Sequence, residues 1–190
     1  MKFDNYRKTL FGFTGHQESG KTTIAKALKD HLVNSVDHDR ADIVGFSEPL
    51  YEMVKIFGFT DEQIADKQFR NQPQECFGGG TIRQFFKTVG IDARNFYSDI
   101  WVDLMIERSY NNQAKTIICD NVRFENEHSK LSKQFNLILI GIVNSDLEPD
   151  INHPSEQHIP TLIANSDFVI DNSGYTLDPQ QHVEVLMNQM

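Results

Sequence analysis

One short segment near the start of the chain limits its fold more than any other. Residues 15–22 read Gly-His-Gln-Glu-Ser-Gly-Lys-Thr, which matches the pattern G-x-x-x-x-G-K-[ST]. An apolar run of strand type precedes it at 9–14, and Ile24, Ala25 and Leu28 recur after it at helical spacing. A strand, a glycine-bracketed loop and a helix start form a cradle for phosphates, because N–H groups turn inward and the helix N-terminus adds positive charge. This context favours a phosphate-binding loop over a glycine turn that matches the pattern by chance.

Within this loop the expected roles are specific. The Lys21 ammonium is expected to reach the outer phosphates of a bound polyphosphate, and the Thr22 hydroxyl to bind Mg²⁺. Asp120 ends an apolar run of strand type, the usual position of the carboxylate that holds this ion through water. The alternative for Asp120 is a turn aspartate that caps the next element. The residues expected to hold the phosphates are Gly15, Gln17, Glu18, Ser19, Gly20, Lys21, Thr22 and Thr23, and those expected at the metal are Thr22 and Asp120.

The charge of the chain is unevenly distributed. The net charge is −9, and all 18 Lys and Arg residues lie at or before Lys133, so that 134–190 carries acids but no Lys or Arg. A protein that binds a long nucleic acid usually presents a basic face. This pattern therefore argues against nucleic acid as the main ligand and favours small anionic substrates held by individual residues.

Two further features bear on location. No apolar run approaches the length of a membrane span, and the N-terminus has no apolar signal core. The two cysteines, Cys76 and Cys119, are too few for a disulfide framework. We therefore expect a cytoplasmic protein with no membrane partner.

Strand-type and helix-type segments alternate along the chain. Strands are expected at about 9–14, 42–46, 115–120, 137–143 and 167–171; helices at 20–33, after Pro49, from Thr60, from Ile82, from Ile100, at 124–134 and from Pro179; and a polar loop at 67–80. Strands separated by helices imply a parallel sheet with helices on both faces. The predicted fold is α/β, a P-loop NTPase three-layer fold with a five-stranded, mostly parallel, doubly wound sheet and a lid insertion.

Five segments, taken in order, carry a family resemblance. They are the phosphate loop, 46–50, 83–94 with Trp101 downstream, 121–127, and 153–156 followed by 167–174. Together they resemble the bacteriophage deoxynucleoside monophosphate kinases, a branch of the nucleoside monophosphate kinase-like P-loop proteins. The guanine-reading motif N-K-x-D of signalling GTPases is absent. The resemblance implies one kinase domain over 1–190, with a helical acceptor-side insertion at 67–112 and a lid at 144–160.

The implied reaction is transfer of the ATP γ-phosphoryl group to the 5′-phosphate of a deoxynucleoside monophosphate, which would supply DNA precursors in a host cytoplasm. ATP and Mg²⁺ are the implied cofactors, and the nucleotides are the implied partners. The acceptor phosphate supplies the attacking oxygen, so the protein must hold two polyanions in line and exclude water. The family usually has an acidic residue where this chain has Asn121, which leaves Asp120 as the candidate carboxylate.

Arginines are expected to clamp the acceptor, because a guanidinium fork matches a phosphate face. Arg123 follows the third strand, at the edge where open α/β sheets bind ligands. The implied catalytic residues are Lys21, Arg123, Asp120 and Arg83; the implied substrate-binding residues are Phe46, Ser47, Glu48, Arg83, Arg94, Arg123 and Glu127. Each arginine could instead be a solvated surface cation. Phe46 fits base stacking or core packing equally, and Glu127 either pairs with Arg123 or begins a helix.

The lid at 144–160 lacks Lys and Arg, which leaves His153 and His158 as its only groups able to become cationic. Three explanations stay open: the cations at 83–94 supply the charge, a second subunit of a homodimer supplies it, or turnover is weak. Two other functions therefore stand beside the kinase. One is a nucleotide-binding module with weak or no turnover that acts through a partner. The other is a phosphotransferase for a different acceptor, including a hydroxymethylated base in DNA.

Overall fold

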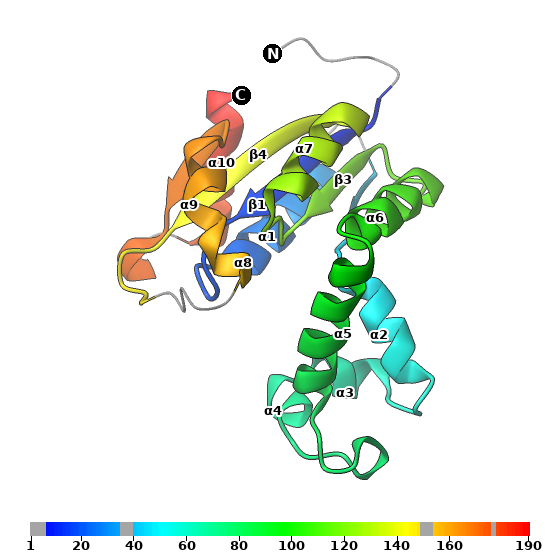
Figure 1. Ribbon diagram of the computed structural model, residues 1–190. Helices are drawn as coiled ribbons and strands as arrows, with labels where there is room; N and C mark the ends of the chain where they lie inside the picture. Colours follow the sequence, from blue (N-terminus) through cyan, green and yellow to red (C-terminus); the bar gives the residue numbers. More distant parts are fainter. Residues whose placement is uncertain (1–6, 35–39, 149–153, 176–177) are drawn as a thin grey trace. The chain divides into compact units, whose positions relative to one another are not determined.

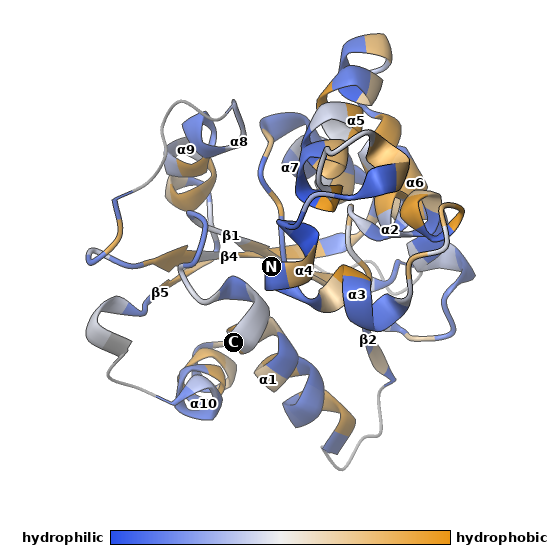
Figure 2. Cartoon of the chain, turned by 90° about the horizontal axis from the view of Figure 1, so that it is seen from below, coloured by the Kyte–Doolittle hydropathy of each residue, from blue (hydrophilic) through white to orange (hydrophobic). Residues whose placement is uncertain are grey.

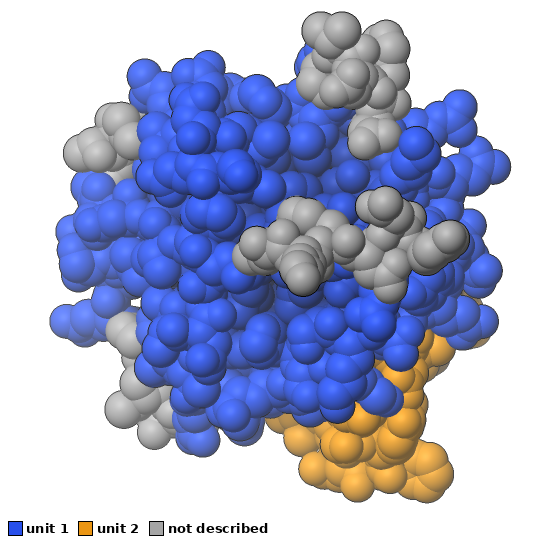
Figure 3. Space-filling view, turned by 90° about the horizontal axis from the view of Figure 1, so that it is seen from above, with its two compact units in different colours: residues 1–45, 105–190 blue, residues 46–104 orange. Residues whose placement is uncertain are grey.

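The computed structural model describes residues 7–34, 40–148, 154–175 and 178–190. The chain divides into two compact units, which Figure 3 colours separately. One unit combines 1–45 with 105–190, and the other is 46–104. The expected helical acceptor-side insertion, 67–112, overlaps this second unit in part, and its role stays a prediction.

The larger unit is built on a five-stranded sheet. Its strands are β1 (Thr9–Thr14), β2 (Ala41–Ile43), β3 (Thr116–Cys119), β4 (Asn136–Val143) and β5 (Phe168–Asp171). Their order is β2-β3-β1-β4-β5, and every neighbouring pair is parallel. The predicted parallel, doubly wound sheet is confirmed. β2 is shorter than the expected 42–46, although the Val44 N–H still donates to the Ile118 carbonyl at 2.9 Å.

Helices cover both faces of this sheet (Figures 1 and 2). α1 (Lys21–Asn34) and α10 (Pro179–Gln189) lie on one face, and α7 (Glu125–Gln134), α8 (Pro154–Gln157) and α9 (Ile159–Ala164) lie on the other. The apolar side chains of α1 and α10 pack with those of the central strands in one buried cluster that includes Phe13, Leu28, Ile140 and Val183. The predicted three-layer arrangement is therefore confirmed.

The strand register brings two loops together at the carboxyl edge of the sheet. Gly12 of β1 lies opposite Cys119 of β3, and just beyond them the Val122 N–H donates to the Phe13 carbonyl at 2.9 Å. A Cβ on Gly12 would lie 3.1 Å from the Val122 side chain, so a larger residue there would crowd Val122 and require it to shift. As a result, the loop after β3 runs beside the phosphate loop that follows β1.

The unit 46–104 contains α2 (Glu48–Lys55), α3 (Asp61–Ala65), α4 (Lys67–Arg70), α5 (Ile82–Phe96) and the start of α6 (Ile100–Asn111). Buried Val54, Ile64 and Ile82 form its core together with a group of aromatic rings. The helix expected from Thr60 is present as α3, and a capping box formed by Thr60 and Gln63 opens it.

Part of the expected loop at 67–80 is helical, so that prediction is wrong for α4 and for a 3₁₀ turn at Glu75–Phe77. The Asp66 carboxylate accepts the N–H groups of Gln68 and Phe69 at 2.7 and 3.3 Å, which stabilises the start of α4.

The expected lid stretch, 144–160, includes α8 and the beginning of α9. His153 lies outside the described residues. Across the described part of the chain, no helix is long and apolar enough to cross a bilayer.

Candidate functional site

The phosphate loop has the backbone form that binds anions. Positive φ angles occur at Gly15 (148°), Glu18 (67°) and Gly20 (98°), and α1 begins at Lys21. A Cβ on Gly15 would lie 2.4 Å from the Ile142 carbonyl oxygen, so this position admits only glycine. Left-handed residues between right-handed ones make successive N–H groups converge, and the following helix start adds its partial positive charge.

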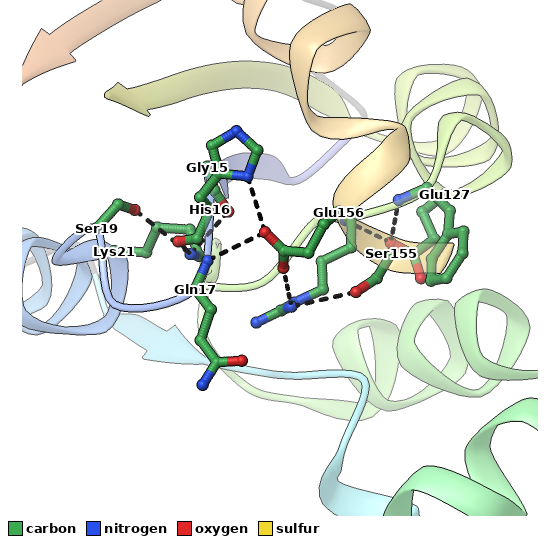
Figure 4. Close-up of polar contacts among 10 residues, drawn as sticks. Gly15, His16, Gln17, Ser19, Lys21, Glu127, Ser155 and Glu156 are labelled. Atoms are coloured by element: carbon green, nitrogen blue, oxygen red, sulfur yellow. Dashed lines mark hydrogen bonds and ion pairs between the residues drawn. The ribbon is translucent and has the colours of Figure 1, made fainter. Parts of the chain in front are cut away.

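Lys21 is folded into this loop. It is buried, and its Nζ donates to the carbonyl oxygens of Gly15 at 2.8 Å and His16 at 2.5 Å (Figure 4). The pKa of Lys21 falls from 10.5 to about 8, first because the side chain is buried and then because of the Arg123 charge, while the charges of Glu156 and Asp120 oppose the shift. A buried ammonium with too little negative charge around it is suited to an incoming phosphate.

The two residues expected at the metal are in direct contact. The Thr22 hydroxyl donates to Asp120 Oδ2 at 2.6 Å, although 98 residues separate them in the sequence. Hard oxygen donors of this kind suit Mg²⁺, which usually takes only one or two protein ligands and completes its shell with water and phosphate oxygens. The described residues hold no cluster of three or more His, Cys, Asp and Glu side chains that could bind a metal. Thr22 and Asp120 therefore fit the protein side of a nucleotide-bound Mg²⁺, whose other ligands would be water and phosphate oxygens.

Arg123 is held at both its backbone and its side chain. Its N–H donates to Glu127 Oε2 at 2.8 Å, and the Phe124 N–H donates to the same oxygen at 3.1 Å. Glu127 is buried and caps the start of α7, so it lies at a helix start and also contacts the Arg123 backbone; its role toward a substrate stays a prediction. The Arg123 guanidinium donates through Nη1 to Glu156 Oε1 at 3.0 Å and lies 3.4 Å from the Ser155 hydroxyl.

Glu156 connects Arg123 to the phosphate loop. Its carboxylate is only 4% exposed, and Oε2 lies 2.8 Å from His16 Nδ1 and 3.3 Å from the Gln17 N–H (Figure 4). One buried carboxylate thus contacts the loop through one oxygen and Arg123 through the other. The sequence indicated Glu156 only as part of the resembling segment 153–156, and no local pattern identified its partners.

The remaining predicted residues belong to the unit 46–104. Phe46 is 6% exposed, which agrees with core packing. Ser47 precedes α2 and Glu48 is its first residue, whereas Arg83 and Arg94 lie in the first and last turns of α5. Arg83 is exposed and Arg94 is partly buried. The acceptor-binding roles of these residues stay predictions.

Comparison with known proteins identifies the fold. No protein-family profile and no curated protein matches the sequence. Solved structures do match: shikimate kinase from Aquifex aeolicus (13% identity, TM-score 0.51, 95% of this chain and 94% of that one) and the Thermus thermophilus protein TT1252 (13%, 0.53, 97% and 98%). Mycobacterium tuberculosis APS kinase CysC, solved with AMPPNP and APS, also matches (8%, 0.50, 96% of each chain). At these identities the similarity is one of fold, and the chain has the α/β fold of P-loop kinases.

Proposed function

We propose that this protein is an ATP-dependent kinase that converts deoxynucleoside 5′-monophosphates to diphosphates. The observation that carries the proposal is the chain of contacts from the phosphate loop through Glu156 to Arg123. A kinase needs a donor polyphosphate and an acceptor anion side by side, and this arrangement gives each a cation. The deoxynucleotide as acceptor is supported by the five resembling segments of the sequence.

In this proposal the chain contributes positioning and charge rather than a covalent intermediate. The loop amides and Lys21 hold the β- and γ-phosphates of ATP, and Thr22 and Asp120 would hold Mg²⁺, which would supply positive charge to these phosphates. Arg123 holds the acceptor phosphate, one oxygen of which attacks the γ-phosphorus while the bond to the β–γ bridging oxygen breaks. Both contacts of Arg123 to Ser155 and Glu156 use Nη1, and a guanidinium has five N–H donors in all.

The test is a direct assay of phosphoryl transfer. The purified protein is incubated with Mg-ATP and, separately, with each common deoxynucleoside and ribonucleoside monophosphate, and nucleotides are separated by chromatography. We expect at least one deoxynucleoside diphosphate to form with equimolar ADP, and none to form with Lys21→Ala, which removes a charge from the transition state. Near-normal turnover by Lys21→Ala, or no diphosphate from any acceptor, would contradict the proposal.

A second candidate is a nucleotide-binding module with little or no turnover that acts through a partner. The observation that favours it is the absence of Lys and Arg from 134–190, a stretch that includes the expected lid. The same assay separates the two functions when ATP binding is measured alongside it. Tight ATP binding without any acceptor-dependent ADP would favour the binding module.

A further inference from the structure

A buried amide joins the end of the sheet to the phosphate loop. Asn172 directly follows β5 and is 6% exposed. Its Nδ2 donates to the Ser19 carbonyl oxygen at 2.9 Å, and its backbone N–H donates to the Val143 carbonyl at 2.8 Å. Because a carbonyl oxygen can only accept, the side-chain atom that faces Ser19 is the nitrogen, and Oδ1 must face the other way.

His182 of α10 contacts that other end of the amide. Its Nε2 lies 3.2 Å from Asn172 Oδ1, and the side chain is 5% exposed. Since Oδ1 only accepts, Nε2 must carry the hydrogen, which fixes the tautomer of the neutral ring. Burial lowers the pKa of His182 and Asp171 opposes this shift, so the ring favours its neutral form.

The second glycine of the loop leaves room for this contact. A Cβ on Gly20 would lie 2.4 Å from Asn172 Nδ2, and its φ of +98° also disfavours any side chain. The Ser19 carbonyl is therefore held toward Asn172. In a trans peptide the C=O and the following N–H point in opposite directions, so the Gly20 N–H points away from Asn172.

We propose that Asn172 and His182 are positioning residues that orient the Ser19–Gly20 peptide and so direct the Gly20 N–H at the bound polyphosphate. The inference rests on the proposed function, because it assumes that the loop binds ATP. Neither side chain touches the reacting atoms in this role. Both act through the loop, and a rigid loop binds its anion more tightly because less ordering is needed on binding.

The test compares three variants with the wild-type full-length chain. Asn172→Asp has almost the same shape but places an oxygen against the Ser19 carbonyl. His182→Leu removes the ring donor, whereas His182→Gln keeps an N–H at a similar distance from the backbone. Two quantities are measured: the Kd for Mg-ATP, by calorimetry, and the amide hydrogen exchange of 15–22 without nucleotide, by mass spectrometry.

We expect Asn172→Asp and His182→Leu to raise the Kd for Mg-ATP about tenfold, the effect of losing one buried hydrogen bond. Both should also speed amide exchange in 15–22, whereas His182→Gln should stay within about threefold of the wild type in Kd. The matched control is Ser109→Ala, which removes a buried hydroxyl that donates to the Met105 carbonyl at 2.8 Å. It should lower stability without changing Kd or exchange in the loop.

Two results would overturn the inference. One is an Asn172→Asp protein that unfolds more easily but, like Ser109→Ala, keeps its Kd and loop exchange. The other is equal behaviour of His182→Gln and His182→Leu, because the hydrogen bond would then have no part in the effect. If Asn172→Asp does not fold, the comparison of His182→Gln with His182→Leu still tests whether the hydrogen bond to Asn172 matters. If the wild type does not bind ATP, the proposed function fails, while loop exchange still shows whether the pair orders the loop.

Discussion

Arg123 is the single residue whose proposed role is easiest to separate from ATP binding. Arg123→Ala should raise the acceptor KM about tenfold or more and change the ATP Kd much less, because charge-assisted hydrogen bonds to the acceptor are lost. Steady-state kinetics with each substrate varied in turn checks this.

Two further variants serve as controls. Arg123→Lys keeps the positive charge toward Glu156 but lacks the forked guanidinium. Arg40→Ala is the matched surface control, since Arg40 is exposed and contacts Gln113. A collapse of ATP affinity with an unchanged acceptor KM would assign Arg123 to the donor instead.

Asp120 gives the second prediction for a single residue. Asp120→Asn keeps a partner for Thr22 but removes the negative charge that favours Mg²⁺, so about tenfold more Mg²⁺ should be needed for half-maximal turnover. A Mg²⁺ titration at saturating ATP measures this. Asp42→Asn is the control, because Asp42 pairs with Lys29 at 2.8 Å and should affect only stability. An unchanged titration would point to another carboxylate.

Some site residues could be predicted from the sequence and others could not. The difference lies in how many residues separate each one from its contacts along the chain. Lys21 and Thr22 belong to one continuous motif with a known backbone form, and Asp120 was found because it ends an apolar run. The contact of Glu156 with Gln17 spans 139 residues, and that of Asn172 with Ser19 spans 153. Neither partner forms a local pattern, because Glu156 lies in α8 and Asn172 follows β5, and only the folded chain brings these two positions to the loop after β1.

At the scale of elements, α5 depends on its first turn. Thr81 accepts the Gln84 N–H at 3.1 Å, and Gln84 Oε1 accepts the Thr81 N–H at 2.8 Å, which completes a capping box. Thr81→Ala should lower the free energy of unfolding by about 1 kcal/mol, whereas Thr81→Ser, which keeps the hydroxyl, should stay close to the wild type. Urea unfolding followed by far-UV circular dichroism compares them. Equal loss in both variants would show that the methyl group rather than the cap stabilises this turn.

Elements were predicted well where they were long or strictly periodic. β1 was placed at its observed bounds, and α7 and α10 began within a residue of the expected positions. α4 was missed because its four residues are too few to show a helical period, and Asp66 was its only local signal. β2 was placed too long because Val44 and Phe46 are apolar for reasons of core packing, after the strand has ended.

At the scale of the whole molecule, binding and stability oppose each other at Lys21. Its pKa is about 8 in the folded chain and 10.5 ordinarily, so the fold bears the full penalty of a buried charge below about pH 8. Between about pH 8 and 10.5 the folded chain loses this proton while the unfolded chain keeps it. Because the unfolded state then binds more protons, this residue's contribution to stability rises with pH across that window.

Lys21→Met makes this opposition measurable, because it keeps the length of the side chain and removes the charge. Without nucleotide at pH 7 the variant should be the more stable protein, by at most on the order of 3 kcal/mol, and its advantage should disappear between about pH 8 and 10.5. Denaturant unfolding of both proteins is measured across this pH range. The difference between their free energies of unfolding reports on Lys21, since all other groups titrate in both proteins. Added Mg-ATP should stabilise the wild type and leave Lys21→Met unchanged, because only a state that binds the ligand gains from it. A stability difference that is constant with pH would show that packing, and not the buried charge, separates the two proteins.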